Sequence, residues 1–546
     1  MRFRVSRLAA ALVFGFLLTS STSALATTRW VNDPPNTYLP PGTSCTNPGY
    51  PTIGAAVAAA VSGDTIRVCD GMYTENVILN KSLMLLGAQA GMDACGRVAS
   101  ESIVTPSNPL VRTLELQAGS ANSIIDGFTF SGGTRAIEST TGPIDGLQLL
   151  NNRIRQFTNN GVFLNDQGLN ITINQNEIDG TNKLGGGGLF HLDQDNFDGF
   201  WFTNNCVVNG TTGTGFFVDG TRNVDSGGGS TRLPRFSGNF IANNGTGVNL
   251  GRLAWGDGPI SGNTFSNNLF DGLQGGPKNS LITQNTFDSN GRHGLALTSF
   301  SAVVSTDPNR GAQGNTVTQN CFTANGFPLG GAGIFFSATQ FPGTISTNMV
   351  HKNNIFGNFI GARYLATVPG TTDTETINAE FNWWGSPTGP THPSNPSGTG
   401  DSVVDNGPLF PGGIDFANWL TSPVGGTPCF AVSAGKATGG GQVNVLNGRG
   451  SFGFNARFDG GPGSGHLNYI NHFTGAHLDC TVTAVTLFTS TTAEFSGPCS
   501  ANSDATSFTA HVEDHAEPGK GADKFTITYN SMTEGGTLIS GNIQIH

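Results

Sequence analysis

The 546-residue chain has few charged residues, and those that it has are mostly acidic. Charged side chains make up 12% of the sequence, about half of the ~25% that is usual for soluble domains. Lysine and arginine total 26 against 37 aspartates and glutamates, which gives a net charge of -11. This balance argues against nucleic acid and against an anionic membrane as partners, because both are negatively charged.

Long apolar runs are also scarce. The longest candidate, Leu8–Leu18, follows a basic segment at residues 2–7 and precedes the small-x-small sequence Ala24-Leu25-Ala26. The run is shorter than the ~20 residues that span a bilayer, and this order of segments is typical of a secretory signal peptide. We therefore expect a signal peptide over residues 1–26, cleavage after Ala26, no transmembrane segment, and a protein that is secreted or held at the cell surface.

Glycine, in contrast, is abundant. The 79 glycines are about twice the usual share of roughly 7%, and 38 phenylalanines supply apolar material for a core. Many glycines with few lysines and glutamates predict short strands and tight turns rather than helices.

Eight cysteines in an exported chain allow up to four disulfides. We expect two of these pairs, Cys45–Cys69 and Cys480–Cys499. The partners of the remaining four are left open: Cys95, Cys206, Cys321 and Cys429.

A short motif, Asn-x-apolar, recurs through the middle of the chain at spacings of 22 to 35 residues. Its asparagines are Asn152, Asn176, Asn205, Asn239, Asn263, Asn285, Asn320, Asn354 and Asn382. Most units also contain a turn that ends in glycine and an alternating strand, as in Gly161-Val-Phe-Leu164. Such a short unit without a helix buries its apolar face only by stacking on a copy of itself, which predicts a parallel β-solenoid. The recurring asparagine can then hydrogen-bond to its counterpart ~4.8 Å away in the next coil.

Two flanking segments carry a family resemblance. Residues 52–83, with the alanine-rich Ala55–Ala60 and Gly71-Met72-Tyr73, are similar to the opening of secreted right-handed parallel β-helix (pectate-lyase-like) proteins. Residues 381–401, FNWWGSPTGPTHPSNPSGTGD, resemble the closing segment of the same proteins. The resemblance implies an all-β fold, with a right-handed parallel β-helix over residues 27–420 and an N-terminal capping helix at Ile53–Val61.

The repeat ends before residue 430. Valine, threonine and phenylalanine then alternate between glycine-rich turns, as in FTITYNSM and TLISGNIQIH, which predicts a small antiparallel β domain over residues 430–546. The segments GHLNYINH, DHAEPGKGADKF and GNIQIH resemble a C-terminal module of bacterial surface proteins. This resemblance implies a location rather than an activity.

The alternating strands predict one outward side chain in each coil. In families of this fold the ligand lies in a groove along one sheet, and the residues expected to face it are Phe163, Phe190, Phe217, Asn249, Gln274 and Arg363. Stacked rings suit the apolar face of a sugar, so we expect polysaccharide or cell-wall glycan as the partner. We also expect the protein to be a monomer. If the register is shifted by one residue, these rings face the core instead.

Charged residues in the loops after these strands are the candidates for catalysis. They are Asp193, Asp219, Arg222 and Arg252. Carboxylates on adjacent coils are typical calcium ligands, and an arginine beside them can act on an acidic sugar. Solvated loop charge is the simpler interpretation of the same residues.

Three segments partly resemble enzymes of the superfamily. Arg232–Arg235 is similar to a pectate lyase segment, Leu250–Trp255 to a pectin methylesterase segment, and His293-Gly294 to a polygalacturonase segment. Each lacks the partners that its reaction needs: near His293, for example, we find Asp271 and Asp288 but no third aspartate. We therefore expect His293 to be a corner residue rather than a catalytic one.

Together these observations favour a glycan-binding protein without an identifiable catalytic set. The alternatives are a lyase, hydrolase or epimerase acting on acidic glycans, and a structural or adhesive stalk. Calcium is the one cofactor considered, and no metal is assigned to the six histidines of the C-terminal domain.

Overall fold

The computed structural model describes the chain in segments. They are residues 26–32, 37–185, 187–193, 197–219, 232–251, 255–298, 311–338, 345, 347–366, 376–405, 413–425, 429, 435–458, 463–488, 492–530 and 532–546. The expected signal peptide lies outside them, except for Ala26.

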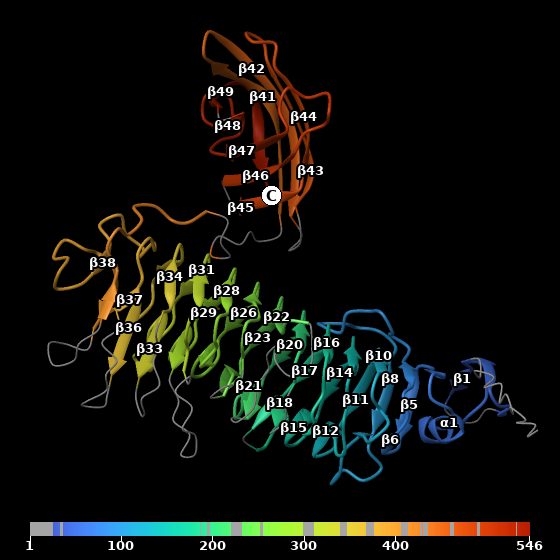
Figure 1. The fold of residues 1–546 in the computed structure, drawn as a ribbon. Coiled ribbons are helices and arrows are strands. Elements are labelled where there is room, and N and C mark those ends of the chain that lie inside the picture. The colour runs from blue at the N-terminus through green and yellow to red at the C-terminus, as the bar shows by residue number, and fades with distance from the viewer. Residues whose placement is uncertain are drawn as a thin grey trace, which may run out of the picture.

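Most of the chain winds into a right-handed parallel β-helix with three sheets, here called sheets A, B and C (Figure 1). Their 14, 11 and 13 strands pair in parallel with the strands of the coils before and after. Sheet A contains β1 (Thr28–Val31), β4 (Thr65–Val68), β7 (Met84–Leu86), β10 (Ile124–Asp126), β13 (Gln148–Leu150), β16 (Thr172–Asn174), β19 (Trp201–Thr203), β22 (Arg235–Ser237), β25 (Ile260–Ser261), β28 (Leu281–Thr283), β31 (Thr316–Thr318), β34 (Met349–His351), β37 (Thr376–Asn378) and β40 (Gly413–Asp415).

Sheets B and C follow sheet A in most coils. Sheet B contains β5 (Gly71–Thr74), β8 (Ser102–Thr105), β11 (Phe128–Ser131), β14 (Arg153–Arg155), β17 (Glu177–Asp179), β20 (Cys206–Val208), β23 (Phe240–Ala242), β26 (Thr264–Ser266), β29 (Thr286–Asp288), β32 (Cys321–Thr323) and β35 (Asn354–Phe356). Sheet C contains β6 (Val77–Leu79), β9 (Leu114–Leu116), β12 (Arg135–Ser139), β15 (Asn160–Leu164), β18 (Gly188–Asp193), β21 (Thr214–Asp219), β24 (Thr246–Asn249), β27 (Leu273–Gly275), β30 (Leu295–Thr298), β33 (Ile334–Ala338), β36 (Ala362–Ala366), β38 (Pro390–Thr391) and β39 (Gly400–Val404).

The first coil is covered by a short helix, as the alanine-rich segment predicts. Helix α1 (Ile53–Ala59) buries Ile53, Ala56 and Val57, and the Thr52 side chain accepts a hydrogen bond from the Ala55 N–H at its start. A small antiparallel pair, β2 (Gly42–Ser44) and β3 (Asn47–Pro48), lies beside β1. An open end of stacked strands would recruit other chains, and the helix closes it.

Buried asparagines connect the coils at their corners. At the A–B corner each asparagine donates its backbone N–H to the side-chain Oδ1 of the asparagine one coil later, in the series Asn152, Asn176, Asn205, Asn239, Asn263, Asn285, Asn320, Asn353 and Asn382. The eighth member is Asn353 rather than Asn354, because Asn354 already belongs to β35. A second ladder, which sequence reasoning did not separate from the first, follows the B–C corner through Asn244, Asn268, Asn290, Asn325 and Asn358.

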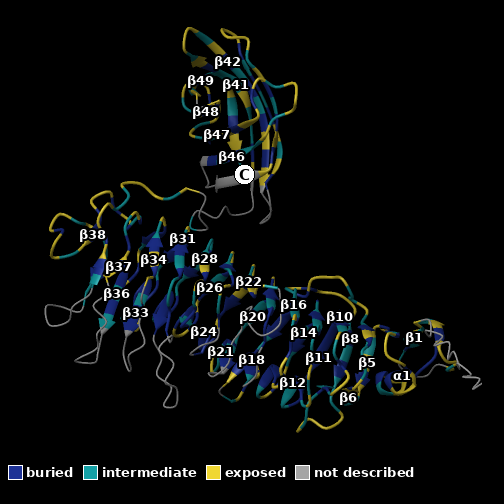
Figure 2. Ribbon diagram, in the orientation of Figure 1, coloured by how far each residue is buried: buried dark blue, intermediate teal, exposed yellow. Residues whose placement is uncertain are grey.

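The interior of the β-helix is a continuous apolar column. Figure 2 shows the buried residues inside the coils and most exposed ones at the turns. The rings of Phe265, Phe287 and Phe322 stack through successive coils, with centroids 4.9 and 4.8 Å apart. Each buried ring contributes roughly 1.5–3 kcal/mol by leaving water, so this column stabilises the stack over its whole length.

The C-terminal domain is a nine-stranded antiparallel sheet with its own core. Its strands are β41 (Gly435–Val445), β42 (Gly448–Phe458), β43 (Ser464–Asn471), β44 (His477–Val482), β45 (Ala484–Phe488), β46 (Thr492–Pro498), β47 (Ser507–Glu513), β48 (Lys524–Tyr529) and β49 (Met532–Ile545). The sheet curls until β44 meets the end of β46, where Cys480 and Cys499 form a disulfide.

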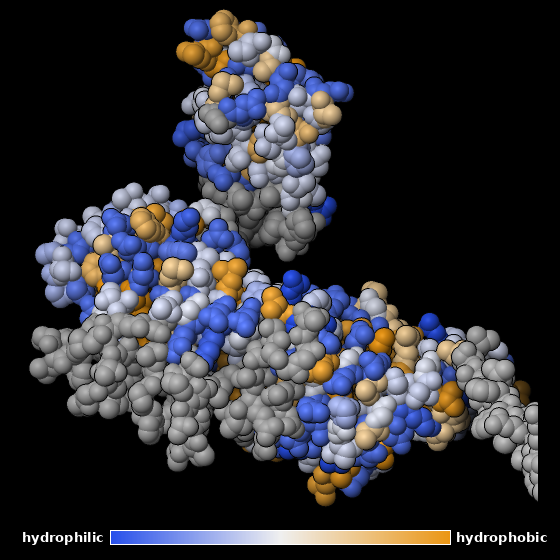
Figure 3. Space-filling model, in the orientation of Figure 1, coloured by the Kyte–Doolittle hydropathy of each residue, from blue (hydrophilic) through white to orange (hydrophobic). Residues whose placement is uncertain are grey.

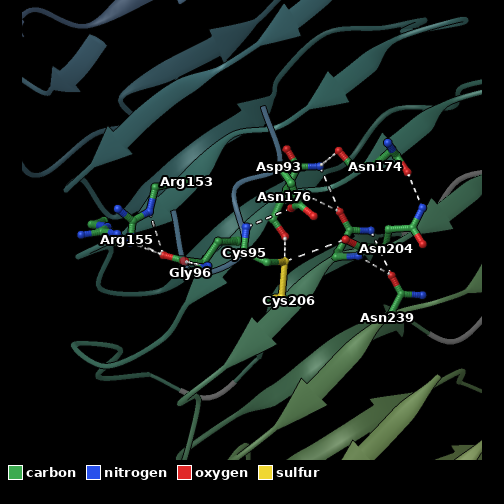
Figure 4. Close-up of a disulfide and its surroundings, with 12 residues drawn as sticks. Asp93, Cys95, Gly96, Arg153, Arg155, Asn174, Asn176, Asn204, Cys206 and Asn239 are labelled. Carbon is green, nitrogen blue, oxygen red and sulfur yellow. Dashed lines mark hydrogen bonds and ion pairs between the residues drawn. A yellow bond between two sulfur atoms is a disulfide. The ribbon is translucent and has the colours of Figure 1, made fainter. Parts of the chain in front are cut away.

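Four disulfides account for all eight cysteines, and they include both pairs expected from the sequence, Cys45–Cys69 and Cys480–Cys499. The four cysteines left open form the pairs Cys95–Cys206 and Cys321–Cys429. In each of these two pairs, one cysteine begins a strand of sheet B and the other lies on a segment far away in the sequence (Figure 4 shows the first). None of the described helices is both long and apolar enough to cross a membrane.

Candidate functional site

The outer face of sheet C presents one side chain per coil in unbroken register. We call these residues the sheet C row; in order they are Glu115, Glu138, Phe163, His191, Phe217, Asn249, Gln274, Ala296, Phe335 and Arg363. Five of the six residues predicted to face a ligand belong to it: Phe163, Phe217, Asn249, Gln274 and Arg363. Neighbouring positions in the row are ~4.8 Å apart because the coils are neighbouring strands of one sheet.

The prediction for Phe190 is wrong. Phe190 pairs with Val162 and Phe216 on the inward side and is 0% exposed. Val162 and Phe190 occupy the same position in neighbouring coils, but the glycine before them does not. Gly161 directly precedes Val162, whereas Gly188 lies two residues before Phe190. His191 therefore takes the outward position, since a shift of one residue reverses every side chain of a strand.

Charged side chains at the first end of the row neutralise one another. Arg112 pairs with Glu115 at 3.0 Å and also with Glu138, which pairs in turn with Arg135. Burial works to raise the pKa of Glu115, but its hydrogen bonds and the charge of Arg112 outweigh burial and hold that pKa below its usual value. The Arg135 guanidinium lies 3.8 Å from the centre of the Phe163 ring. At this end of the row, the two arginines and the two glutamates therefore form ion pairs with one another.

Three rings form the middle of the row. The His191 ring lies 5.0 Å from the Phe163 ring and 4.7 Å from the Phe217 ring, measured between centroids. Phe163 is 5% exposed and His191 9%, so these two offer only their edges. Phe217 and the amides of Asn249 and Gln274 are partly exposed. Beyond these two buried rings, the row therefore becomes accessible again at Phe217.

A carboxylate, an arginine and a histidine meet at the second end of the row. Asp271 is fully buried; its Oδ1 accepts from Arg292 Nε at 2.8 Å and from the His293 N–H at 3.2 Å. These hydrogen bonds raise the pKa of Arg292 and keep its guanidinium charged. The His293 ring stacks on Phe335 with centroids 4.1 Å apart and rings almost parallel. Arg363 is the next residue of the row after Phe335.

Burial sets the protonation state of His293. Burial lowers its pKa to about 4, the positive charges of Arg292 and Arg363 act in the same direction, and Asp271 opposes them. Nδ1 accepts a hydrogen bond from the Ala332 N–H at 3.0 Å, so the proton of the neutral ring is on Nε2. His293 is thus a neutral, stacked histidine at pH 7. Its position at the B–C corner agrees with the corner role expected from the sequence.

Exposed apolar side chains border this end of the row at the B–C corner. We call them the corner strip: Leu269, Phe270, Phe327, Leu329 and Phe359, each between 41% and 53% exposed. The Phe327 and Phe359 rings meet edge to face at 5.5 Å, and the Arg292 guanidinium lies 5.7 Å from the centre of the Phe270 ring.

Sequence reasoning missed the corner strip, although the sequence holds a signal for it. In three coils of the second ladder, Asn244, Asn290 and Asn325 are each followed by glycine. In the other two coils, the position of this glycine is taken by Leu269 and Phe359. Large apolar residues at a solvent-facing corner are unusual and indicate an interaction surface.

The structure describes two of the four candidate catalytic residues. Asp193 and Asp219 are register partners at the ends of β18 and β21, whereas Arg222 and Arg252 lie outside the described residues. Within the described segments, no three histidine, cysteine or acidic side chains are grouped to hold a metal ion. Calcium binding therefore stays a prediction.

The stacked coils define the chain as a right-handed parallel β-helix protein with a separate antiparallel C-terminal domain. The family model of the right-handed β-helix region matches residues 187–375. Among curated proteins, none matches the chain significantly.

Solved structures of similar fold include a pectate lyase, with 12% identity, a TM-score of 0.28, and coverage of 73% of this chain and 79% of the lyase. The enzymatically active domain of a tailspike protein of bacteriophage CBA120 has 11% identity, a TM-score of 0.33, and coverage of 89% of this chain and 73% of that domain. An alginate lyase from Paenibacillus sp. has 12% identity, a TM-score of 0.30, and coverage of 71% of this chain and 99% of the lyase.

Proposed function

We propose that the protein binds an extended acidic polysaccharide along the sheet C row and the corner strip. The observation that carries the proposal is the unbroken register of the row, which runs through ten coils and is bordered by exposed rings at one end. A surface that repeats every ~4.8 Å suits a polymer better than a single small molecule.

The side chains at the accessible end fit a sugar acid. The exposed faces of Phe270 and Phe359 suit the apolar face of a sugar ring. The Gln274 amide can donate to and accept from hydroxyl groups. Arg363 supplies positive charge for a carboxylate, whereas Arg292 is already paired with Asp271. A guanidinium binds a carboxylate through two parallel hydrogen bonds.

The proposal places this binding outside the cell. Four disulfides are typical of proteins in an oxidising compartment. The sequence of residues 1–26 reads as a signal peptide, which supports secretion or display at the cell surface.

Binding can be tested with the full chain against a panel of neutral and acidic polysaccharides, by affinity electrophoresis and calorimetry. We expect binding to acidic polymers, and affinity about 3- to 10-fold lower in Phe217→Ala and Phe359→Ala, because each change removes one ring contact. Phe240→Ala is the matched control, since Phe240 is 45% exposed but lies on sheet B. Equal weakening by all three variants, or no effect from any, would contradict the assignment of this surface.

Cleavage or epimerisation of an acidic glycan is the second candidate. The observation in its favour is the pairing of Asp193 with Asp219 on neighbouring coils next to the row. Glycan-cleaving enzymes use a pair of acidic residues for proton transfer to and from the sugar. Incubation with uronate polymers distinguishes the two candidate functions. New reducing ends, unsaturated ends or altered uronate stereochemistry would support an enzyme. Loss of these products in Asp193→Asn would assign a catalytic role to Asp193.

A further inference from the structure

The C-terminal domain contains a concave surface of its own. An open pocket of about 350 Å³ is lined by Gln442, Asn447, Gly448, Arg449, His472 and Phe473. Its volume lies within the range of roughly 300–1,000 Å³ that is usual for small-molecule sites. We infer that this pocket binds an acidic sugar unit, independently of the ligand proposed for the β-helix.

The walls of the pocket are fixed to each other through the backbone. Strands β41 and β42 pair up to Val445 and Gly448, which leaves a two-residue turn, and Asn447 in this turn has a left-handed φ of 61°. The His472 N–H donates to the Arg449 carbonyl at 2.9 Å and joins the loop after β43 to this hairpin. A pre-formed pocket loses less conformational entropy when it binds a ligand.

Glycine at position 448 permits this approach. A Cβ atom on Gly448 would lie 2.8 Å from the Phe473 Cβ, which is closer than two side chains tolerate. Any larger residue must push the hairpin and the Phe473 loop apart. The site is therefore sensitive to a substitution that removes none of its polar groups.

The polar groups of the pocket favour a carboxylate. Arg449 is exposed, and among the described residues no acidic side chain forms an ion pair with it. His472 Nε2 lies 2.6 Å from Ser451 Oγ, which holds the imidazole at the rim. A free guanidinium is the group best suited to a planar carboxylate, which it binds through two parallel hydrogen bonds.

The remaining lining suits the rest of a sugar. Phe473 is 59% exposed and offers a ring to the apolar face of a pyranose. The amides of Gln442 and Asn447 can bind hydroxyl groups as donors or acceptors. The lining contains no carboxylate or thiolate, so its chemistry does not suit a hard metal cation. One cation, two amides and one ring in a single pocket therefore define a site for a sugar acid.

The test uses the full chain with glucuronate oligosaccharides, and with glucose oligosaccharides as the neutral probe, in titrations followed by NMR. We expect shifts at the resonances of residues 442–449 and 472–473 with the acidic probe, and affinity at least ~10-fold lower in Arg449→Gln, because a charge-assisted pair is lost. Gly448→Ala should weaken binding although Arg449 is retained. Arg457→Gln, an exposed arginine on the same strand, is the control and should leave binding unchanged.

The β-helix surface is tested separately by Phe217→Ala. Unchanged binding at the C-terminal pocket in this variant supports two independent sites. The inference is overturned if Arg449→Gln binds as tightly as the unmodified protein, if the neutral probe binds equally well, or if Phe217→Ala abolishes the shifts in the C-terminal domain. Thermal melting of each variant establishes that it is folded.

Discussion

At the scale of single residues, His293 shows how surroundings decide the chemistry of a side chain. In the sequence it stands in a glycine-rich turn and resembles a catalytic histidine. In the structure its Nδ1 already accepts a backbone hydrogen bond and its ring lies flat on Phe335. Asp271 contacts its backbone N–H, so that carboxylate positions the turn and the Arg292 side chain. The role of His293 here is structural support for the accessible end of the row.

This burial predicts a pH dependence of stability. The pKa of His293 is about 4 in the folded protein against 6.5 for an ordinary histidine. Between pH 6.5 and 4 the unfolded chain binds a proton that the folded chain does not, so the free energy of unfolding falls as the pH falls. The loss is about 2 kcal/mol at pH 5 and about 3 kcal/mol at pH 4.

Urea unfolding of the β-helix at pH 7 and pH 5 measures this loss. The decrease from pH 7 to pH 5 should be smaller in His293→Gln than in the unmodified protein, because glutamine does not titrate. His477→Gln, an exposed histidine of the C-terminal domain, is the matched control. An equal decrease in all three proteins would show that His293 is not the group responsible.

At the scale of the repeating elements, the asparagine ladders hold the corners of the coils. Asn285 accepts from the Asn263 N–H at 3.0 Å and donates to the Ile260 carbonyl at 2.8 Å and to Asn320 Oδ1 at 2.9 Å. All of these groups are buried, so each needs a partner. The first ladder was visible in the sequence because an apolar residue follows each of its asparagines two positions later. The second ladder has the same period, but glycine often follows its asparagines, and Asn-Gly alone is typical of an ordinary turn.

Replacing one rung should therefore cost more than the loss of one surface amide. Asn285→Ala leaves several buried donors and acceptors unsatisfied, and we expect the free energy of unfolding to fall by about 2–4 kcal/mol. Asn165→Ala, at an exposed position after β15, should change it by less than ~0.5 kcal/mol. Chemical denaturation of both variants provides the comparison, and similar values for the two would refute a stabilising ladder.

At the scale of the whole molecule, two disulfides attach distant segments to sheet B. The segment around Cys95 lies across several coils: the Ala94 N–H donates to the Gln175 carbonyl and the Arg97 side chain to the Asn151 carbonyl. The Cys321–Cys429 disulfide attaches the chain that follows the last strand of the β-helix.

The surface of the molecule has mixed polarity. In Figure 3 hydrophilic and apolar side chains are mixed over the coloured part of the visible face.

Removing the first of these disulfides should destabilise only the β-helix. Cys95→Ser with Cys206→Ser opens a loop of 111 residues, and the chain-entropy estimate for that length is about 4–5 kcal/mol. Because the two domains have separate cores, calorimetry should show the β-helix transition at lower temperature and the C-terminal transition unchanged. Cys480→Ser with Cys499→Ser should do the reverse. Equal shifts of both transitions in both variants would mean that the domains unfold as one unit.

The sequence by itself determined the winding of the coils, the capping helix, the antiparallel C-terminal domain and two disulfides. Each follows from a local period or a short spacing, because strand, corner and core positions repeat within one coil. Only the tertiary structure decided the outward position of His191 in place of Phe190, the corner strip and the pairing of Cys95 with Cys206. These depend on how many residues each loop inserts before the chain returns to the same sheet, and therefore on which residues of successive coils come to lie side by side.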